Sequence, residues 1–550
     1  MILFVPFFFC WPSLASAYVP YEVGYRLDIG VWHPLSESPE QACEVGSKAW
    51  LGDPSRYLSS SVGSDARCSL RYTMTNGIEN TMTFIVSAVS NGQCSSNSVE
   101  EQAPSGGMAC QCRPGFLENA GATACEAAAP EPKQLAGPLC KAPIAGIWTP
   151  FPIALASAEK YRSELDWADS GPAPLTLIRT YRSNWGNDTS RPNSELGRVW
   201  THNHAIHLKL TPVSSPSTAT ITSPEGYLRS FIKAAGTSTW SAANGADTLT
   251  EAGGVWFYKR ADDDSVTAFT ADGKPQTTTA GNGFVTTYGY DGAGHLGTVS
   301  NSFGRSLVFS YANDKLASVT TPDGRVIGYT YDASGRLVTV AYPDGKSRSF
   351  LYENSTYPLA LTGILDEASA RWGTFSYDSQ GRAIASELAG GVSRYQASYP
   401  SSRSATVVDP LNTSRGYGYS IIKGKLAVTA GSLPSGEGEP DAASRVQDVN
   451  GLVSSEIDFL GFRTDYVWDT ARRLPTSVTE AVGTDARTVT TQWHATFSLP
   501  VLITEPGRTT AYAHEAVGNV LSKTVTDTAS SPNTARTWSW TYNAQQLVER

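Results

Sequence analysis

Residues 329–352 read YTYDASGRLVTVAYPDGKSRSFLY and contain one complete structural unit. Tyr329 and Tyr331 are two residues apart, so both side chains point to the same face of an extended strand. Asp332 can accept hydrogen bonds from backbone N–H groups two residues further on, and Gly335 supplies the positive φ that a short hairpin loop needs. This stretch therefore predicts a β-hairpin that turns at Asp332.

A second turn follows the hairpin. Residues 336–340 are rich in β-branched side chains and predict the return strand. Tyr342-Pro343-Asp344-Gly345 predicts the next turn, because proline presets φ at the first central position. A single hairpin is marginally stable in water, whereas stacked neighbours bury a continuous face.

The unit recurs along the C-terminal half of the chain. Residues 288–296 read YGYDGAGHL and residues 375–382 read FSYDSQGR. The aromatic residues Tyr290, Tyr311, Tyr331, Tyr352 and Tyr377 advance by 21, 20, 21 and 25 residues. Copies that keep less of the pattern follow at Tyr417, Tyr466, Tyr512 and Trp540. A period sustained over this length predicts a repeat architecture. We expect an all-β strip of hairpins, and the alternative is a propeller in which two repeats make one four-stranded blade.

Composition supports a β-rich protein of several parts. The chain has 550 residues, of which 40% are hydrophobic and 17% charged, and it contains 49 glycines. The low charged fraction excludes a coiled coil and a charged disordered tail. A net charge of −9 and a pI near 5.4 argue against a nucleic-acid partner, which needs a clustered basic face.

The Y-D-x-x-G-R-L unit, with a P-D-G turn about ten residues later, resembles the YD repeat of the RHS (rearrangement hotspot) family. The matching residues are Tyr331, Asp332, Gly335, Arg336, Leu337, Pro343, Asp344 and Gly345. The block before the repeats resembles the module that commonly precedes RHS repeats. It does so in Glu164-Leu-Asp166, Pro174-Leu175, Arg179-Thr-Tyr181-Arg-Ser183 and Leu196-Gly-Arg-Val-Trp200.

The resemblance implies a fold and a function. The fold is a spiralling strip of hairpins that forms part of a hollow RHS shell, with a pre-repeat module at 141–235 and a shell segment at 236–550 that is cut in mid-repeat. The implied function is a non-enzymatic shell that encloses or delivers a C-terminal effector toxin in competition between bacteria. The implied partners are its own continuation or a downstream effector. The alternative is a cell-surface adhesion or carbohydrate-binding module.

The N-terminal part predicts export. Residues 1–17 combine an apolar run with Ala15-Ser16-Ala17, which is typical of a cleaved signal peptide, although the start lacks Lys or Arg. No other stretch is long and apolar enough to span a membrane as a helix. We therefore expect a secreted or cell-surface bacterial protein.

Seven cysteines lie between residues 43 and 140, which predicts a disulfide-rich region at 18–140. Cys110-Gln-Cys112-Arg-Pro-Gly115-Phe116, followed by Cys125, resembles the last half of an EGF-like module. This resemblance implies a disulfide bond between Cys112 and Cys125. An odd number of cysteines leaves one thiol free or paired between molecules.

Three other motifs have ordinary structural explanations that we favour. His202-Asn-His204-Ala-Ile-His207 could bind a metal but lacks an obvious further ligand. Gly292-Ala-Gly294-His-Leu-Gly297 matches a dinucleotide-binding pattern but falls in a predicted hairpin turn. Asp262-Asp263-Asp264 could bind calcium but lacks the rest of an EF-hand loop. The repeated Tyr and Trp residues could stack on sugars, although core packing explains them first.

We therefore predict no catalytic, metal or cofactor residues. The residues expected to matter are those of the repeat turns, and they matter for folding. They are Asp291, Gly294, Asp332, Gly335, Arg336, Asp344, Gly345, Asp378, Gly381 and Arg382.

Overall fold

The computed structural model divides the chain into two compact units, residues 1–126 and 127–550. It describes residues 148–549 except 189–190, 192–193, 212–215, 227, 234–235, 243–245, 262, 423–424, 435–441 and 484–485. Before residue 148 it describes the strands β1 to β8. The predicted signal peptide at 1–17, Cys43 and Cys140 lie outside the described residues.

The first unit contains short antiparallel sheets. One has the strand order β1-β4-β3-β2, and the pairs β5-β6 and β7-β8 form two others. The sulfur atoms of Cys112 and Cys125 are 2.07 Å apart, which makes them a disulfide bond between β6 and β8. The strands are β1 (Tyr21–Asp28), β2 (Tyr57–Val62), β3 (Arg67–Thr73), β4 (Glu79–Cys94), β5 (Ser98–Gln102), β6 (Met108–Cys112), β7 (Phe116–Glu118) and β8 (Cys125–Ala127).

The second unit begins with two four-stranded antiparallel sheets, which we call the pre-repeat segment (residues 148–242). Their strand orders are β12-β11-β10-β9 and β13-β14-β15-β16. The strands are β9 (Ile153–Ala154), β10 (Glu159–Ala168), β11 (Thr176–Arg182), β12 (Trp200–His202), β13 (His207–Thr211), β14 (Thr218–Thr222), β15 (Leu228–Lys233) and β16 (Trp240–Ala242).

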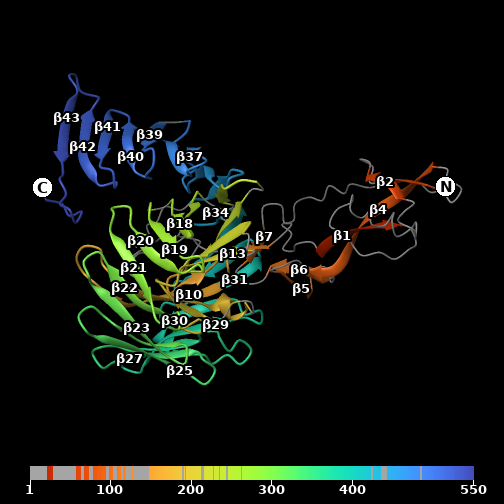
Figure 1. Cartoon of the computed structure of the whole chain (residues 1–550), viewed down its shortest axis with the longest axis horizontal. Coiled ribbons are helices and arrows are strands. Elements are labelled where there is room, and N and C mark those ends of the chain that lie inside the picture. The colour runs from red at the N-terminus through yellow and green to blue at the C-terminus, as the bar shows by residue number, and fades with distance from the viewer. Residues whose placement is uncertain are drawn as a thin grey trace. The chain divides into compact units, whose positions relative to one another are not determined.

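The repeats form one antiparallel sheet of 27 strands in chain order, from β17 to β43 (Figure 1). Each strand pairs with the strand before it and the strand after it, so the sheet is a continuous meander. The propeller alternative is therefore wrong, because a propeller requires separate small sheets. The predicted all-β strip of hairpins is confirmed.

The strands of this sheet follow one another at short intervals. They are β17 (Thr248–Ala252), β18 (Val255–Lys259), β19 (Val266–Phe269), β20 (Pro275–Thr279), β21 (Val285–Tyr290), β22 (Leu296–Asn301), β23 (Ser306–Ala312), β24 (Lys315–Thr320), β25 (Val326–Tyr331), β26 (Leu337–Ala341), β27 (Ser347–Leu351), β28 (Gly363–Leu365), β29 (Arg371–Tyr377), β30 (Ala383–Leu388), β31 (Tyr395–Ser401), β32 (Ser404–Val408), β33 (Ser414–Ile422), β34 (Lys425–Gly431), β35 (Ser444–Gln447), β36 (Val453–Ile457), β37 (Arg463–Asp469), β38 (Leu474–Glu480), β39 (Arg487–Trp493), β40 (Pro500–Glu505), β41 (Arg508–His514), β42 (Val520–Asp527) and β43 (Thr534–Ser539).

Helical structure in the described part of the chain is confined to the 3-10 turns η3 (Ser183–Gly186) and η4 (Ala389–Gly391). Among those residues, no helix has the length and apolar character needed to cross a membrane.

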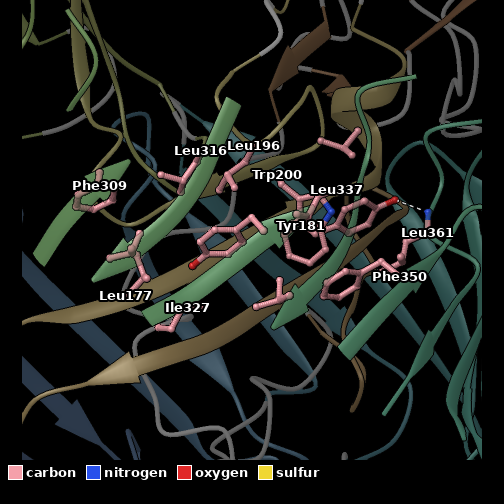
Figure 2. Packing of buried hydrophobic residues seen from close by; sticks show 14 of the residues in the cluster. Leu177, Tyr181, Leu196, Trp200, Phe309, Leu316, Ile327, Leu337, Phe350 and Leu361 are labelled. Carbon is pink, nitrogen blue, oxygen red and sulfur yellow. Dashed lines mark hydrogen bonds between the residues drawn. The ribbon is translucent and has the colours of Figure 1, made fainter. Parts of the chain in front are cut away.

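The main hydrophobic core lies between the pre-repeat segment and one face of the sheet. Tyr181 and Trp200 from β11 and β12 pack against Leu316, Ile327 and other side chains of β22 to β29, as Figure 2 shows. In β23 and β25 these side chains come from alternate positions, as expected for one face of a strand. In β24 and β26 the two buried positions are three residues apart, because the register shifts by one residue between them. We call this the inner face of the sheet.

The strip also returns on itself. The Ser498 N–H donates to Asp264 Oδ2 at 2.6 Å, and the Ser498 hydroxyl donates to the Ala261 carbonyl at 2.8 Å. Gly518 approaches the earlier turn so closely that a Cβ there would lie 3.3 Å from the Gly281 carbonyl oxygen. These partners are more than 230 residues apart, so hairpins late in the strip lie against hairpins early in the strip, as in a spiral.

The inner face should be much more sensitive to truncation than the outer face. We expect Val319→Ala to lower the free energy of unfolding by about 2 kcal/mol, because it removes buried methyl groups and leaves a cavity. Val319 is 0% exposed, whereas Val326 on the next strand is 50% exposed. Val326→Ala is the matched control and should change stability little. Equal losses in chemical denaturation would contradict this assignment of faces.

Candidate functional site

The predicted turn residues form a shared hydrogen-bond pattern in the hairpin loops at one end of the strands. Asp332 Oδ1 accepts the N–H groups of Ser334 at 2.9 Å and Arg336 at 3.0 Å, and Arg336 Nε donates to Asp332 Oδ2 at 2.6 Å. Gly335 has a φ of 73° and donates its N–H to the Asp332 carbonyl. Burial acts to raise the pKa of Asp332, but hydrogen bonds and charge from Arg336 lower it overall. The aspartate thus closes its own hairpin loop as an anion.

The other repeats use the same pattern. Asp378 Oδ1 accepts the Arg382 N–H at 2.9 Å, and Arg382 Nε donates to Asp378 Oδ2 at 2.8 Å. Asp291 accepts the N–H groups of residues 293 and 295. Gly294 and Gly381 have φ values of 86° and 79°.

The P-D-G turn lies at the opposite end of the strands, between β26 and β27. Gly345 has a φ of 80° and donates its N–H to the Tyr342 carbonyl at 3.0 Å. Asp344 Oδ1 accepts the Lys346 N–H at 3.1 Å.

Each repeat tyrosine reaches back to the turn of the preceding repeat. The Tyr352 hydroxyl donates to the Leu337 carbonyl at 3.0 Å, and the guanidinium of Arg336 lies 5.1 Å from the centre of the Tyr352 ring. We call this pair of contacts the clasp. It combines a hydrogen bond with a cation–π contact. Burial raises the pKa of Tyr352, so its hydroxyl keeps the proton that it donates.

The clasp recurs along the sheet with an offset of fifteen or sixteen residues. The hydroxyls of Tyr290, Tyr311 and Tyr331 each donate to the carbonyl fifteen residues earlier, and that of Tyr399 donates to the Ala383 carbonyl sixteen residues earlier. The residue just before that carbonyl contacts the ring in each case. These ring contacts are Lys274 with Tyr290, His295 with Tyr311, Lys315 with Tyr331 and Arg382 with Tyr399. The repeat spacing contained this signal, but a strand tyrosine by itself predicts only a core position.

A buried ionic cluster joins the pre-repeat segment to the sheet. Arg179 donates through Nε and Nη2 to the Asp166 carboxylate at 2.5 and 2.8 Å, and both side chains are 0% exposed. Tyr329 of β25 donates to Asp166 Oδ2 at 3.0 Å. The rings of Trp200 and Phe350 lie 4.9 and 5.2 Å from the guanidinium. Burial acts to lower the pKa of Arg179, but the Asp166 carboxylate raises it overall.

A second ion pair crosses the same interface. Arg348 of β27 donates to Glu164 of β10 at 2.6 Å. Burial acts to raise the pKa of Glu164, but Arg162, Arg179 and Arg348 lower it overall. The sequence identified these pre-repeat residues only as family markers, and their partners in the sheet were not predicted.

The histidine motif is mostly buried. The strand β12 ends at His202, whose Nε2 is 2.9 Å from Glu195 Oε1, and the His204 N–H donates to His202 Nδ1 at 3.2 Å. Burial and the neighbouring His202 lower the pKa of His204 to about 3. His207 is an exposed residue of β13. Within the part of the chain that the structure describes, no group of three or more His, Cys, Asp or Glu is placed to hold a metal ion.

The other two motifs lie in turns. Gly294 belongs to the β21–β22 hairpin loop, which is followed by a strand and not by the helix of a dinucleotide site. Asp263 accepts from Ser265, and Asp264 accepts from Ser498 and pairs with Lys259 at 3.0 Å. Asp262 lies outside the described residues.

Comparison with protein families matches two parts of the chain. A model of the RHS repeat matches residues 311–347, which contain the clasp and both turns of one repeat. The chain therefore contains an RHS repeat. A domain of unknown function (DUF6531) matches residues 151–231, which lie in the pre-repeat segment. No curated protein matches the chain in sequence.

The chain is also similar to parts of solved structures. "Crystal Structure of TcdB2-TccC3-Cdc42" matches with a TM-score of 0.37 and 10% identity, covering 70% of this chain and 26% of that one. "Structure of Photorhabdus luminescens Tc holotoxin pore, Mutation TccC3-D651A" matches with a TM-score of 0.38 and 9% identity, covering 73% and 25%. The chain thus spans about a quarter of the length of these structures.

The positive φ of the turn glycine should matter for stability. We expect Gly335→Val to cost about 1–3 kcal/mol, because a β-branched residue is strained at this φ. An added Cβ at Gly335 meets nothing closer than 3.9 Å, so crowding does not contribute. Gly328→Val is the control, because Gly328 lies in β25 without a positive φ and has similar space around it. Thermal denaturation should show a drop for Gly335→Val alone.

The buried ionic cluster makes a separate prediction. Asp166→Asn leaves the buried Arg179 without a counter-ion, so we expect a loss of about 3–5 kcal/mol in unfolding free energy. Asp323→Asn is the control, because the side chains of Asp323 and its partner Arg325 are 50% and 58% exposed. An exposed ion pair contributes little. Equal effects in urea denaturation would contradict a buried role for Asp166.

Proposed function

We propose that the RHS repeats of this protein form part of a hollow shell that encloses or delivers a C-terminal effector polypeptide. The role of the chain in this proposal is structural and non-catalytic. The expected setting is an exported bacterial protein that acts in competition between cells.

The supporting observation is that the inner face is covered over only part of the strip. Between β22 and β29, buried side chains of that face pack under the pre-repeat segment. Between β36 and β43, Thr510 is the one described strand residue that is buried. No described segment therefore encloses this later part of the inner face.

The later inner face still carries side chains suited to contact a polypeptide. Tyr466, Val478 and Val489 lie directly opposite one another on adjacent strands. Arg487 pairs with Glu480 at 3.2 Å and with Glu505 at 2.6 Å. Apolar rows alternating with paired charges present both hydrophobic area and hydrogen-bonding groups.

The proposal predicts that the two faces of one strand differ in their effect on an enclosed polypeptide. The chain should be coexpressed with the polypeptide encoded downstream of it, and that polypeptide should resist trypsin in the complex. Val489→Lys should reduce the protected fraction, because it places an unpaired charge on the inner face. Thr490→Lys, on the outer face of the same strand, should leave protection unchanged.

Two outcomes would contradict the proposal. One is a downstream polypeptide that trypsin degrades equally with and without the chain. The other is a stable particle without an enclosed polypeptide that binds a glycan array, which would support the cell-surface adhesion alternative.

A further inference from the structure

One short loop makes the hydrogen-bonded contact between a late and an early hairpin of the strip. The β39–β40 loop, residues 494–499, meets the β18–β19 turn, residues 260–265, and we call this contact the seam. Besides the two bonds from Ser498, Lys259 Nζ donates to the Thr496 carbonyl at 2.6 Å and lies 5.6 Å from the Phe497 ring centre. The conformation of this loop therefore determines whether these hydrogen bonds form.

His494 organises the loop from the position that an acidic or amide side chain occupies in other repeats. Its Nδ1 accepts the N–H groups of Thr496 at 3.3 Å and Phe497 at 3.2 Å. At the corresponding position of the β37–β38 turn, Asp469 Oδ1 accepts the N–H groups two and three residues on. In other loops at the same end of the strands, the side-chain oxygens that accept the N–H two residues on belong to Asp291, Asp332, Asp378, Asp448 and Asn543.

An imidazole in this position responds to pH where a carboxylate does not. Imidazole takes up a proton near neutral pH, whereas an aspartate turn stays ionised there. A proton on His494 Nδ1 would remove the acceptor and point an N–H at two other N–H groups. The loop would then lose the hydrogen bonds that shape it.

Charged and titratable groups from three other elements surround the 494–499 loop. Arg472, from the β37–β38 turn, donates to the carbonyls of His494 and Phe497 at 2.8 Å. Lys259 approaches from the end of β18 and is paired with Asp264 of the β18–β19 turn. The ring of His514, from β41, is 5.9 Å from that of His494. The Asp264 carboxylate is thus engaged by Lys259 and by the Ser498 N–H.

We propose that the seam is a pH-sensitive contact in which protonation of His494 releases the 494–499 loop from the β18–β19 turn. The contact is closed at neutral pH and opens in mildly acidic conditions. It joins two parts of the same chain and does not depend on an enclosed polypeptide.

His514 acts in the same direction. Burial and the neighbouring His494 lower the pKa of His514 below its ordinary value. A group with a lowered folded-state pKa contributes stability above its unfolded pKa of ~6.5, and that stability is lost as the pH falls below this value. The expected window for opening is therefore below ~6.5.

Hydrogen exchange of the whole chain tests the proposal. Peptides covering 260–265 and 494–499 should be protected at pH 7.5, and after correction for intrinsic rates should exchange up to about tenfold faster per pH unit below ~6.5. Peptides from β25 to β27 should stay protected throughout and show that the fold is intact. Equal protection of the seam at pH 7.5 and pH 5.5 would overturn the proposal.

The decisive variant is His494→Asn. Asn543 shows that an asparagine in this position accepts backbone N–H groups of its own loop in this chain, from residues 545 and 547 at 3.0 and 2.9 Å. We expect His494→Asn to keep the seam closed at both pH values. His514→Phe retains an aromatic ring, and its seam should still open in acid. If His494→Asn opens in acid as much as the unmodified chain, His494 is not the switch and the proposal fails.

Discussion

The clasp between a tyrosine and the preceding turn is the interaction on which the repeat sheet depends. The Tyr352 hydroxyl binds the Leu337 carbonyl while its ring lies beneath Arg336, and Arg336 in turn binds Asp332. A single contact thus connects the loop of one hairpin to the strand of the next. Because it recurs at an offset of fifteen or sixteen residues, it joins successive hairpins in the same way over many strands. The Y-D-x-x-G-R spacing is therefore a requirement for propagation, beyond its role within one turn.

The pre-repeat segment covers part of the inner face of the sheet. A sheet with aromatic side chains on one face needs a cover, and β10 to β12 provide it between β22 and β29. The cover contains the buried pair Arg179 and Asp166, to which Tyr329 of the sheet donates a hydrogen bond. Such a pair is costly to desolvate and tolerates few geometries. It is thus well suited to specify how the cover lies on the repeats.

Much of the repeat could be predicted from the sequence, and the tertiary contacts could not. The turn at Asp332, the positive φ at Gly335 and the common face of Tyr329 and Tyr331 follow from residue type and spacing. The partner of Asp166 could not be found in this way, because Tyr329 is 163 residues away. His494 was also missed, because a histidine at the aspartate position does not match the motif by residue type.

The sequence by itself determined the all-β class, the hairpin period and the alternation of apolar and small polar side chains. These are local properties, set by backbone preferences and by the period of two in a strand. Only the tertiary structure decided that the hairpins form one sheet instead of separate blades, which face is covered, and where later turns meet earlier ones. Those outcomes depend on the small twist added at each strand and on contacts such as Ser498 with Asp264, which bring together residues 234 positions apart.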